Sequence, residues 1–362
     1  MFSVLKSERL LAVAAGAAIL GFWLEHTILD LGQVAALAGA ACLVAAIILA
    51  SIRVAHHAEV LAAKVGDPYG TMILTLSAVL VEVIVLAIMM SKEASPTLVR
   101  DTIYSAVMLD INGILGLAAL LGGLKHGEQP YNDDSSRTYS VMILTAMSIS
   151  MVVPEFVPQA KWHFYSAFTI VAMVTLYTVF LRMQAGAHSY FFSYAYPRGK
   201  RDTAEEEHLE NEPVSTSIII LIAGVVVIGA LAEVMSVLLT SGLKGSGAPP
   251  ALMAIVVAAI SASPEIMTAM RAALANRMQA VVNIALGASL STVILTVPVM
   301  EAIALYTGQP FIMAMSPVQT VMVAITLIVA AINLNDGETN AIEGMTHFVL
   351  FATFLMLSSL GL

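Results

Sequence analysis

Residues 249–270 read PPALMAIVVAAISASPEIMTAM. This stretch is long and apolar enough to cross a bilayer, which takes about 20 residues, yet it carries the carboxylate of Glu265 directly after Pro264. Ionisable side chains at membrane depth are costly and mark functional sites. Because Pro264 has no N–H to donate to the carbonyl of Ile260, we expect that carbonyl to be free to face a cation. The neighbouring Ser261 adds a hydroxyl group.

A second acid, Glu82, lies at a comparable position in an earlier apolar segment, residues 69–90. The residues before that segment predict a helix start, with Asp67 as the N-cap and Pro68 at the first helical position. Glu82 then lies about 20 Å along the helix, at roughly 1.5 Å per residue, well inside the hydrocarbon layer. Two buried acids in two matching segments indicate a site that holds cations or protons.

The composition assigns the chain to a broad class. Of 362 residues, 59% are hydrophobic and 11% are charged, and the mean hydropathy is +0.89. Such a chain is a polytopic membrane protein, and its continuous apolar runs predict helices because the strands of a barrel alternate in polarity. The partners expected from this class are the lipid bilayer and small ions. The net charge of −9 comes mostly from loops, so we expect no nucleic-acid partner.

About eleven transmembrane helices are predicted, which makes the fold class an all-α polytopic membrane protein. An uncleaved first span is favoured over a cleaved signal peptide, because nothing downstream resembles an exported soluble domain. The predicted spans are residues 10–25, 33–52, 69–91, 101–123, 138–158, 163–182, 214–240, 249–273, 279–306, 316–334 and 340–361.

The distribution of Lys and Arg predicts the orientation. With the N-terminus in the cytoplasm, twelve of the 16 Lys and Arg residues lie on the cytoplasmic side. The sequence therefore predicts a bacterial inner-membrane protein whose C-terminus is outside. The oligomeric state stays open, a homo-oligomer included.

The spans divide into two sets of five around a polar connection. An odd number of spans per half makes the second half enter the membrane in the opposite sense, which is an architecture of transporters. Glu82 and Glu265 both fall in the second span of their set. The predicted domains are an N-terminal transmembrane helix (1–32), a first repeat (33–183), an acidic cytoplasmic loop (184–213) and a second, inverted repeat (214–362).

The two glutamates predict an exchange mechanism. Calcium binds six to eight oxygens, which carboxylates, carbonyls and hydroxyls can supply. Without a cation, two carboxylates in a low dielectric repel each other and take up protons. Cation and protons therefore exclude each other from Glu82 and Glu265. No cofactor is expected beyond the transported calcium and protons, with sodium or potassium as alternative cargo.

Five motifs resemble those of a known family, the ChaA-type bacterial calcium/proton antiporters. These belong to the cation/proton exchanger branch of the calcium/cation antiporter superfamily, and the resemblance covers nearly the whole chain. The motifs are Gly66-Asp67-Pro68-Tyr69-Gly70, Ile73 to Ser77 with Glu82-Val83, Ser263-Pro264-Glu265, Asn283 to Gly287, and Leu295 to Val299.

The resemblance implies an eleven-span protein that exports calcium against proton entry, with sodium and potassium handled by some members. Its paired glutamates correspond to Glu82 and Glu265, and its carbonyl ligands would fall on Ala78 and Ser261. This sequence lacks the usual Gly-Asn pair before the first glutamate and has residues 77–81 there instead. We expect this departure to bear on cation selectivity.

Other polar residues in the spans have weaker interpretations. Asp110 and Asn112 could form a proton relay or support the site, or they could make a local hydrogen bond in helix packing. Asn283 is expected to line the ion path. Ser289 belongs to a series of small and polar residues that suits close helix approach as well as ion lining.

Acids near span ends are expected to be solvated, which applies to Glu155 and Glu301. Glu343 and His347 are four residues apart, a spacing that can bind zinc, but an intrahelical pair is favoured because no third ligand is in view. Residues 53–64, which include His56 and His57, are expected to form a short linker along the inner membrane surface, and a surface helix is favoured over a pH sensor.

The alternatives come from different functional classes. A sodium/proton or potassium/proton antiporter of the same fold is the closest rival to a calcium/proton antiporter. A cation channel is disfavoured, because midplane acids beside a broken helix suit alternating access. No nucleotide-binding or hydrolase motif is found, so we expect a secondary transporter and not an enzyme. The acids of residues 202–212 are interpreted as a solvated linker in preference to a calcium sensor.

Overall fold

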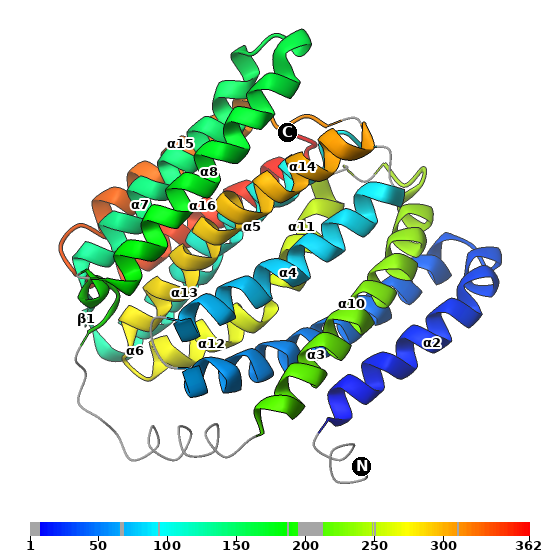
Figure 1. Cartoon of the computed structure of the whole chain (residues 1–362), viewed down its shortest axis with the longest axis horizontal. Helices are drawn as coiled ribbons and strands as arrows, with labels where there is room; N and C mark the ends of the chain where they lie inside the picture. The colour runs from blue at the N-terminus through cyan, green and yellow to red at the C-terminus, as the bar shows by residue number, and fades with distance from the viewer. Residues whose placement is uncertain are drawn as a thin grey trace. The chain divides into compact units, whose positions relative to one another are not determined.

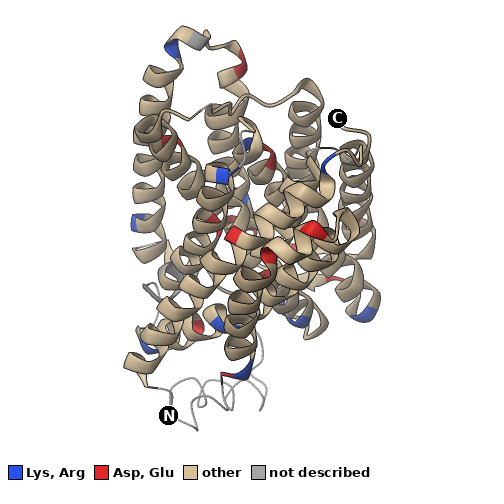
Figure 2. Ribbon diagram, turned by 90° about the vertical axis from the view of Figure 1, so that its right-hand side faces the viewer, with Lys and Arg blue, Asp and Glu red and all other residues tan. Residues whose placement is uncertain are grey.

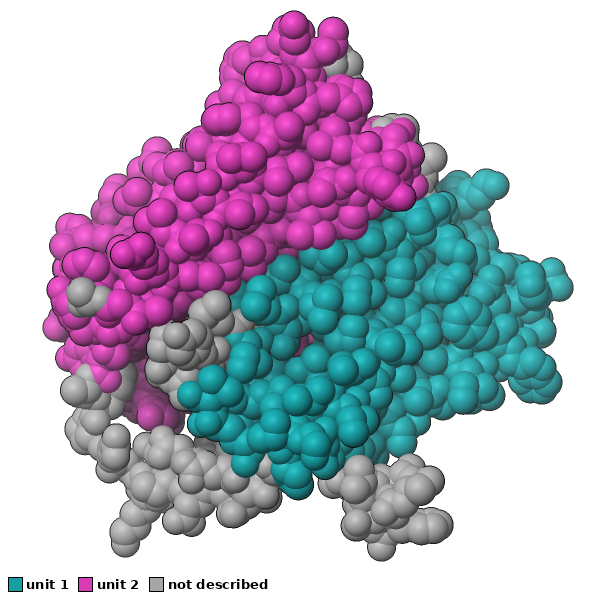
Figure 3. Space-filling model, in the orientation of Figure 1, with its two compact units in different colours: residues 1–94, 198–248 teal, residues 95–197, 249–362 magenta. Residues whose placement is uncertain are grey.

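The protein was analysed as a computed structural model, which describes residues 8–65, 69–92, 95–186, 188–194, 213–247, 249, 251–309 and 311–362. Figure 1 labels its helices and strands. The chain divides into two compact units, coloured teal and magenta in Figure 3. Unit 1 comprises residues 1–94 and 198–248, and unit 2 comprises residues 95–197 and 249–362.

In its described residues, unit 1 is built from four long helices. Charged residues are sparse along most of the ribbon of the whole chain (Figure 2). α10 packs along α3 and also contacts α2 and α4. The helices are α2 (Arg9–Asp30), α3 (Gln33–Val65), α4 (Tyr69–Lys92) and α10 (Val214–Leu243).

The second helix of unit 1 is longer than the sequence predicts. α3 runs for 33 residues without a break. Residues 53–64 are therefore helical, as favoured, but the prediction that they form a separate linker is wrong. These residues contain no Gly or Pro and four of the twelve are Ala, which favours continuation of the helix. The predicted helix start at Asp67 and Pro68 lies outside the described residues, and α4 begins at Tyr69.

Unit 2 contains the remaining spans, several of which change helix type along their length. Its first part comprises α5 (Leu98–Val107), the π-helix η1 (Met108–Leu115), α6 (Gly116–His126), β1 (Gln129–Pro130), α7 (Asp133–Met147), the π-helix η2 (Ser148–Val152), the 3₁₀ helices η3 (Val153–Phe156) and η4 (Gln159–Lys161), α8 (Trp162–Ala185) and the 3₁₀ helix η5 (Ser189–Phe192).

The second part of unit 2 contains a broken span and ends in two apolar helices. It comprises α11 (Ala251–Ser261), α12 (Ser263–Leu274), α13 (Met278–Ser291), the π-helix η6 (Thr292–Thr296), α14 (Val297–Thr307), α15 (Pro317–Asn333), β2 (Glu338–Thr339) and α16 (Ala341–Ser359).

The predicted fold class, an all-α polytopic membrane protein, is confirmed. Among the described residues, nine helices are long and apolar enough to cross a bilayer, or ten if the bent pair α11 and α12 counts as one span. The apolar helix α15, with 17 residues, corresponds to the remaining predicted span. β1 and β2 add an antiparallel ladder of two residues each.

Residues that the sequence assigns to one side of the membrane contact each other within each unit. These contacts agree with the prediction that successive spans cross the membrane in opposite directions. Which side of the membrane faces the cytoplasm stays a prediction. The contacts are Arg53 with Glu8 and the Gln33 amide with the Lys244 carbonyl in unit 1, and Lys125 with the Leu274 carbonyl and Arg137 with the Asn335 carbonyl in unit 2.

The compact units do not follow the two predicted repeats, because α10 of the second half packs with α2, α3 and α4. The π-helices η1 and η6 both interrupt the third span of a predicted set of five, but η2 interrupts the fourth span of the first set and α15, the fourth of the second set, has no π-helix. The internal repeat therefore stays a prediction. The repeat boundaries at 33–183 and 214–362 stay predictions. The acidic stretch 202–212 lies outside the described residues.

Glycines let two helices of unit 2 approach closely. A Cβ atom built at Gly344 on α16 would meet the backbone of Ala119 and Leu120 on α6, and one at Gly116 would lie 2.8 Å from the Cβ of His347. Small residues at such contacts permit dense packing between membrane helices. The α6–α16 contact therefore requires glycine at these positions.

Substitution of Gly344 by alanine should destabilise the protein by about 1–3 kcal/mol, because a fixed backbone must move to admit the methyl group. Gly16 on α2 is the matched control, since nothing lies within 4 Å of a Cβ built there. Gly16→Ala should be neutral or stabilising by at most about 1 kcal/mol. Thermal unfolding in detergent measures both variants, and equal losses would contradict this account of the contact.

A second prediction concerns the ion pair at the start of α2. Arg53 donates from Nε and Nη2 to Glu8, at 2.8 and 2.6 Å. Burial alone would raise the pKa of Glu8, but the hydrogen bond and charge of Arg53 outweigh burial and hold this pKa below its ordinary value of 4.5. A lowered carboxylate pKa stabilises the folded state at pH values above 4.5 and ceases to do so as the pH falls through the folded pKa.

Glu8→Gln should therefore lower stability near neutral pH by about 1.5–3 kcal/mol, the range for hydrogen bonds to charged groups. The difference in stability between Glu8→Gln and wild type should disappear as the pH falls below 4.5. Unfolding temperatures measured from pH 7 to pH 3 test this expectation. Asp30→Asn, at an exposed position on the same helix, is the control and should show a much smaller gap.

Candidate functional site

Glu82 lies on the buried face of α4. Its exposed fraction is 4%, and Val85, Leu86 and Met89 on the same face are 1% exposed or less. On another face of the helix, Leu76 and Leu80 are 47% and 44% exposed. The carboxylate therefore belongs to the interior of the protein and not to its lipid-facing surface. Ala78, one helical turn earlier, is half-buried.

The span that carries Glu265 is broken as the proline predicts. α11 ends at Ser261, α12 begins at Ser263, and their axes differ by 58°. Pro264 cannot donate to the carbonyl of Ile260, and the hydroxyl of Ser263 donates to that carbonyl instead, at 2.8 Å. The prediction that the Ile260 carbonyl is free is therefore wrong, although a carbonyl oxygen keeps a second lone pair that can accept another ligand.

The two sides of the break present different groups. The hydroxyl of Ser261 donates back to the carbonyls of Val257 and Ala258, at 3.0 and 3.2 Å, so this hydroxyl is occupied. Glu265 is partly exposed in the first turn of α12, where the positive end of the helix dipole favours a carboxylate. The break thus presents a carboxylate near the carbonyl end of the preceding helix.

The predicted carboxylate pair is distributed over the two units, with Glu82 in unit 1 and Glu265 in unit 2. That they share one cation stays a prediction. Among the described residues, no group of three or more His, Cys, Asp and Glu side chains could hold a metal ion.

Two of the predicted supporting residues meet in unit 2. The hydroxyl of Ser289 on α13 donates to Oδ2 of Asp110 on η1, at 3.1 Å, and both residues are buried. Asp110 lies in a π-helical segment, a distortion that is frequent at functional sites because it re-aims side chains. The contact joins two helices, as expected if Asp110 makes a hydrogen bond in helix packing. A role of Asp110 in a proton relay stays a prediction.

Asn112 takes part in a buried polar network that the sequence analysis missed. Its Nδ2 donates to Oγ1 of Thr326 at 2.7 Å, and its Oδ1 lies 2.9 Å from Nδ1 of His347. His347 is 2% exposed, and its Nε2 has no hydrogen-bond partner in the described part of the chain. The predicted pair of Glu343 with His347 is wrong, because Glu343 instead accepts from Asn340.

Asn283 lies among hydrogen bonds that fix the segment after α8. Its Nδ2 donates to the carbonyl of Phe192 at 2.8 Å, and its Oδ1 accepts from Gln279 at 2.9 Å. Gln279 also accepts from the backbone N–H of Asn132 at 2.7 Å. These contacts give Asn283 an anchoring role, and the ion-lining role expected from the sequence stays a prediction.

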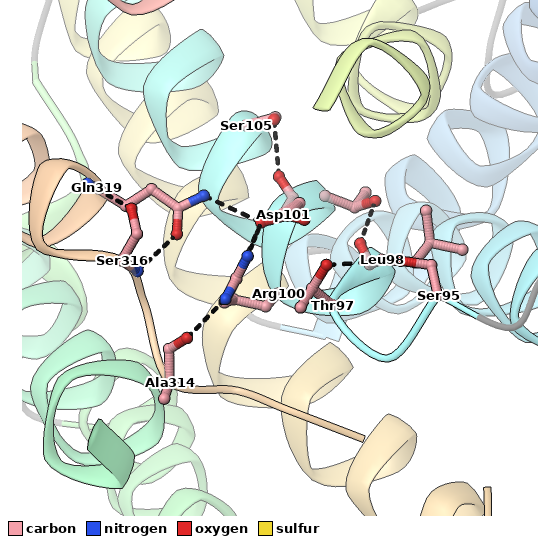
Figure 4. Close-up of polar contacts among 10 residues, drawn as sticks. Ser95, Thr97, Leu98, Arg100, Asp101, Ser105, Ala314, Ser316 and Gln319 are labelled. Carbon is pink, nitrogen blue, oxygen red and sulfur yellow. Dashed lines mark hydrogen bonds and ion pairs between the residues drawn. The ribbon is translucent and has the colours of Figure 1, made fainter. Parts of the chain in front are cut away.

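A second polar cluster that the sequence analysis missed lies at the start of α5 (Figure 4). Asp101, which is 8% exposed, accepts from Arg100 Nη2 at 2.7 Å and from Gln319 Nε2 at 2.9 Å. Arg100 Nη1 also donates to the carbonyl of Ala314 at 2.8 Å. Ser316 and Gln319 form a capping box at the start of α15, which the Ser-x-x-Gln spacing could have revealed.

The acids predicted near span ends differ from each other. Glu155 is exposed, as expected, but Glu301 is only 2% exposed, so the prediction that Glu301 is solvated is wrong. α14 continues six residues beyond Glu301 to Thr307, which places this carboxylate about 9 Å before the helix end at 1.5 Å per residue. Its Oε1 accepts from the hydroxyl of Ser166 at 3.3 Å.

The chain matches the family described as sodium/calcium exchanger protein over residues 35–186 and 216–360. It is 33% identical over 317 residues to the sodium-potassium/proton antiporter ChaA of Escherichia coli, which covers 86% of each chain. It is 26% identical over 284 residues to the calcium/proton antiporter ChaA of Bacillus subtilis, covering 76% of this chain and 78% of that protein.

The fold is similar to a solved structure, that of native YfkE. The TM-score is 0.76 at 18% sequence identity, and the match covers 97% of this chain and 98% of the other. Similarity at this level of identity supports the fold alone.

The network around Asn112 leads to a stability prediction. In His347→Leu, Oδ1 of Asn112 loses its buried donor, which should cost about 1–3 kcal/mol. His347→Asn places an amide N–H near the former Nδ1 and should recover much of that loss. Unfolding temperatures in detergent compare the two variants. If both lose the same stability, the hydrogen bond to Asn112 is not what His347 contributes.

Proposed function

Because the chain belongs to the sodium/calcium exchanger protein family, a family of secondary transporters, we propose that it exports calcium in exchange for protons by alternating access. The predicted resemblance to ChaA-type antiporters is confirmed by the relatives of that name. The observation that carries the proposal is a pair of acids in corresponding spans. Glu82 is buried within α4, and Glu265 lies at the break between α11 and α12.

The pair supplies the chemistry that exchange requires. Two carboxylates neutralise one divalent ion, and the same oxygens bind protons when the cation leaves. A cation and a proton therefore compete for Glu82 and Glu265. The carbonyls of Ala78 and Ser261, together with the remaining lone pair of Ile260, would complete the oxygen shell of the cation.

The alternative cargo is sodium or potassium. The relative with 33% identity is named a sodium-potassium/proton antiporter, whereas the calcium/proton antiporter is 26% identical. Residues 77–81 also replace the Gly-Asn pair expected before Glu82. Calcium remains the proposed cargo because two acidic side chains match its charge and its preference for carboxylate oxygens.

The chain is a multi-pass membrane protein, and its proposed location is the bacterial inner membrane. The excess of Lys and Arg on one side supports a cytoplasmic N-terminus and an external C-terminus. With this orientation, proton entry would drive cation export.

Glu82→Gln and Glu265→Gln should each reduce exchange to the background of empty vesicles, because an amide neither carries the charge nor releases a proton. The protein is reconstituted into vesicles, a pH step is imposed, and calcium, sodium and potassium fluxes are measured in parallel. Glu128→Gln, which changes an exposed acid, is the control and should retain wild-type flux.

The same experiment distinguishes the alternatives. Calcium flux coupled to opposite proton flux supports the proposal. Sodium or potassium flux driven by the pH step, without calcium flux, would show that the monovalent ion is the transported cation. Cation flux without proton counter-flow would indicate a channel. Wild-type calcium exchange by either glutamine variant would overturn the assigned site.

A further inference from the structure

A small cavity in unit 2 lies outside the proposed exchange site. Its volume is about 60 Å³, and its walls come from η3, α8, α14 and the segment before α15. A cavity of this kind needs about 10–15 Å³ to hold one water molecule, so this one has room for a small ion together with water. The lining residues used below are Trp162, Tyr165, Ser166, Glu301, Ile312 and Ala314.

Glu301 is the carboxylate among the described lining residues. It is 2% exposed, and one oxygen accepts from the Ser166 hydroxyl, but its Oε2 has no hydrogen-bond partner in the described ranges. A buried carboxylate oxygen without a partner is costly, because burial removes the water that would otherwise solvate it. Either a bound proton or a positively charged ligand in the cavity would remove this cost.

Neither of two nearby cationic side chains serves this purpose. Lys161 precedes the lining residue Trp162 but is exposed. Arg100 donates to the carbonyl of Ala314, but its charge is paired with Asp101, with 2.7 Å between Nη2 and Oδ1. The charge of Arg100 is therefore balanced by another acid.

Hydrogen bonds to backbone carbonyls hold the walls of the cavity in place. The N–H of Ile312 donates to the carbonyl of Pro96 at 2.8 Å, and Tyr165 donates from its hydroxyl to the carbonyl of Ile149 at 2.7 Å. Because these walls are fixed before a ligand binds, little ordering is required on binding.

The lining determines the class of ligand. Calcium prefers six to eight oxygens with more than one carboxylate, but the described lining includes a single carboxylate, whose charge matches a monovalent ion. The cavity volume excludes a large organic cation. We propose that the Glu301 cavity binds a small monovalent inorganic cation, such as potassium or sodium, at a site that includes neither Glu82 nor Glu265.

Trp162 provides a direct probe of this site. The chain has two tryptophans, and Trp23 on α2 is 79% exposed, so Trp23→Phe leaves Trp162 as the sole indole. Purified Trp23→Phe protein in detergent is titrated with potassium or sodium chloride at fixed pH. N-methylglucamine chloride keeps the ionic strength constant, since its cation is too large for the cavity. The emission of Trp162 should change saturably with potassium or sodium.

Two variants in the Trp23→Phe background test the role of the carboxylate. Glu301→Gln should raise the half-saturating concentration at least about tenfold, as expected for loss of a charged ligand. Glu155→Gln, which changes an exposed acid on the neighbouring η3, should leave the titration unchanged. Glu82→Gln should also respond as the parent does, which separates this site from the exchange site.

Three results would overturn the proposal. They are no saturable response to either cation, an equal response in Glu301→Gln, and a response that follows pH alone, which would make Glu301 a proton site. If Glu301→Gln fails to fold, Ser166→Ala tests the same carboxylate through its hydrogen bond and should weaken the cation response. An unchanged response in Ser166→Ala would then count against the site.

Discussion

Polar groups among apolar helices need partners, and this constraint accounts for most of the specific contacts in the protein. Backbone N–H and C=O groups form hydrogen bonds to each other within a helix, so the constraint applies to side chains and to helix breaks. Asp101 pairs with Arg100, and Asp110 accepts a hydrogen bond from Ser289. Pro264 has no N–H to donate to the carbonyl of Ile260, and this carbonyl accepts from Ser263 instead. Each of these bonds replaces solvation that water would provide in a soluble protein.

The sequence predicts the features that depend on local composition. Apolar length predicts the spans, and Pro264 predicts the break between α11 and α12, because a missing N–H acts within one helical turn. The partners of polar side chains depend instead on contacts between distant helices. His347 and Asn112 are 235 residues apart and Ser289 and Asp110 are 179 apart, so no local pattern reveals either pair.

Burial at helix ends is also a property of the packed structure. Glu155 and Glu301 both looked like solvated acids near span ends, yet one is exposed and the other is buried against α8. The difference arises because Glu155 lies in the short 3₁₀ helix η3, whereas Glu301 lies within α14 and accepts from Ser166 on α8. The continuation of α3 through residues 53–65 has a different origin, since a good helix-forming sequence continues after the hydrophobic stretch ends.

The parts of unit 2 differ in how firmly they are held, and this difference bears on the proposed alternating access. α6 and α16 meet through glycines whose replacement would collide with backbone, so their contact tolerates little sliding. α12, which carries Glu265, is a short helix of 12 residues joined to α11 through Ala262. A change in the angle at this joint breaks few hydrogen bonds, because Pro264 has already removed one of them. α12 also packs against α6, and Lys125 on α6 donates to the carbonyl of Leu274 in the last turn of α12, at 2.8 Å. We therefore expect a change of angle at the joint to displace the first turn of α12, which carries Glu265, while its last turn stays on α6.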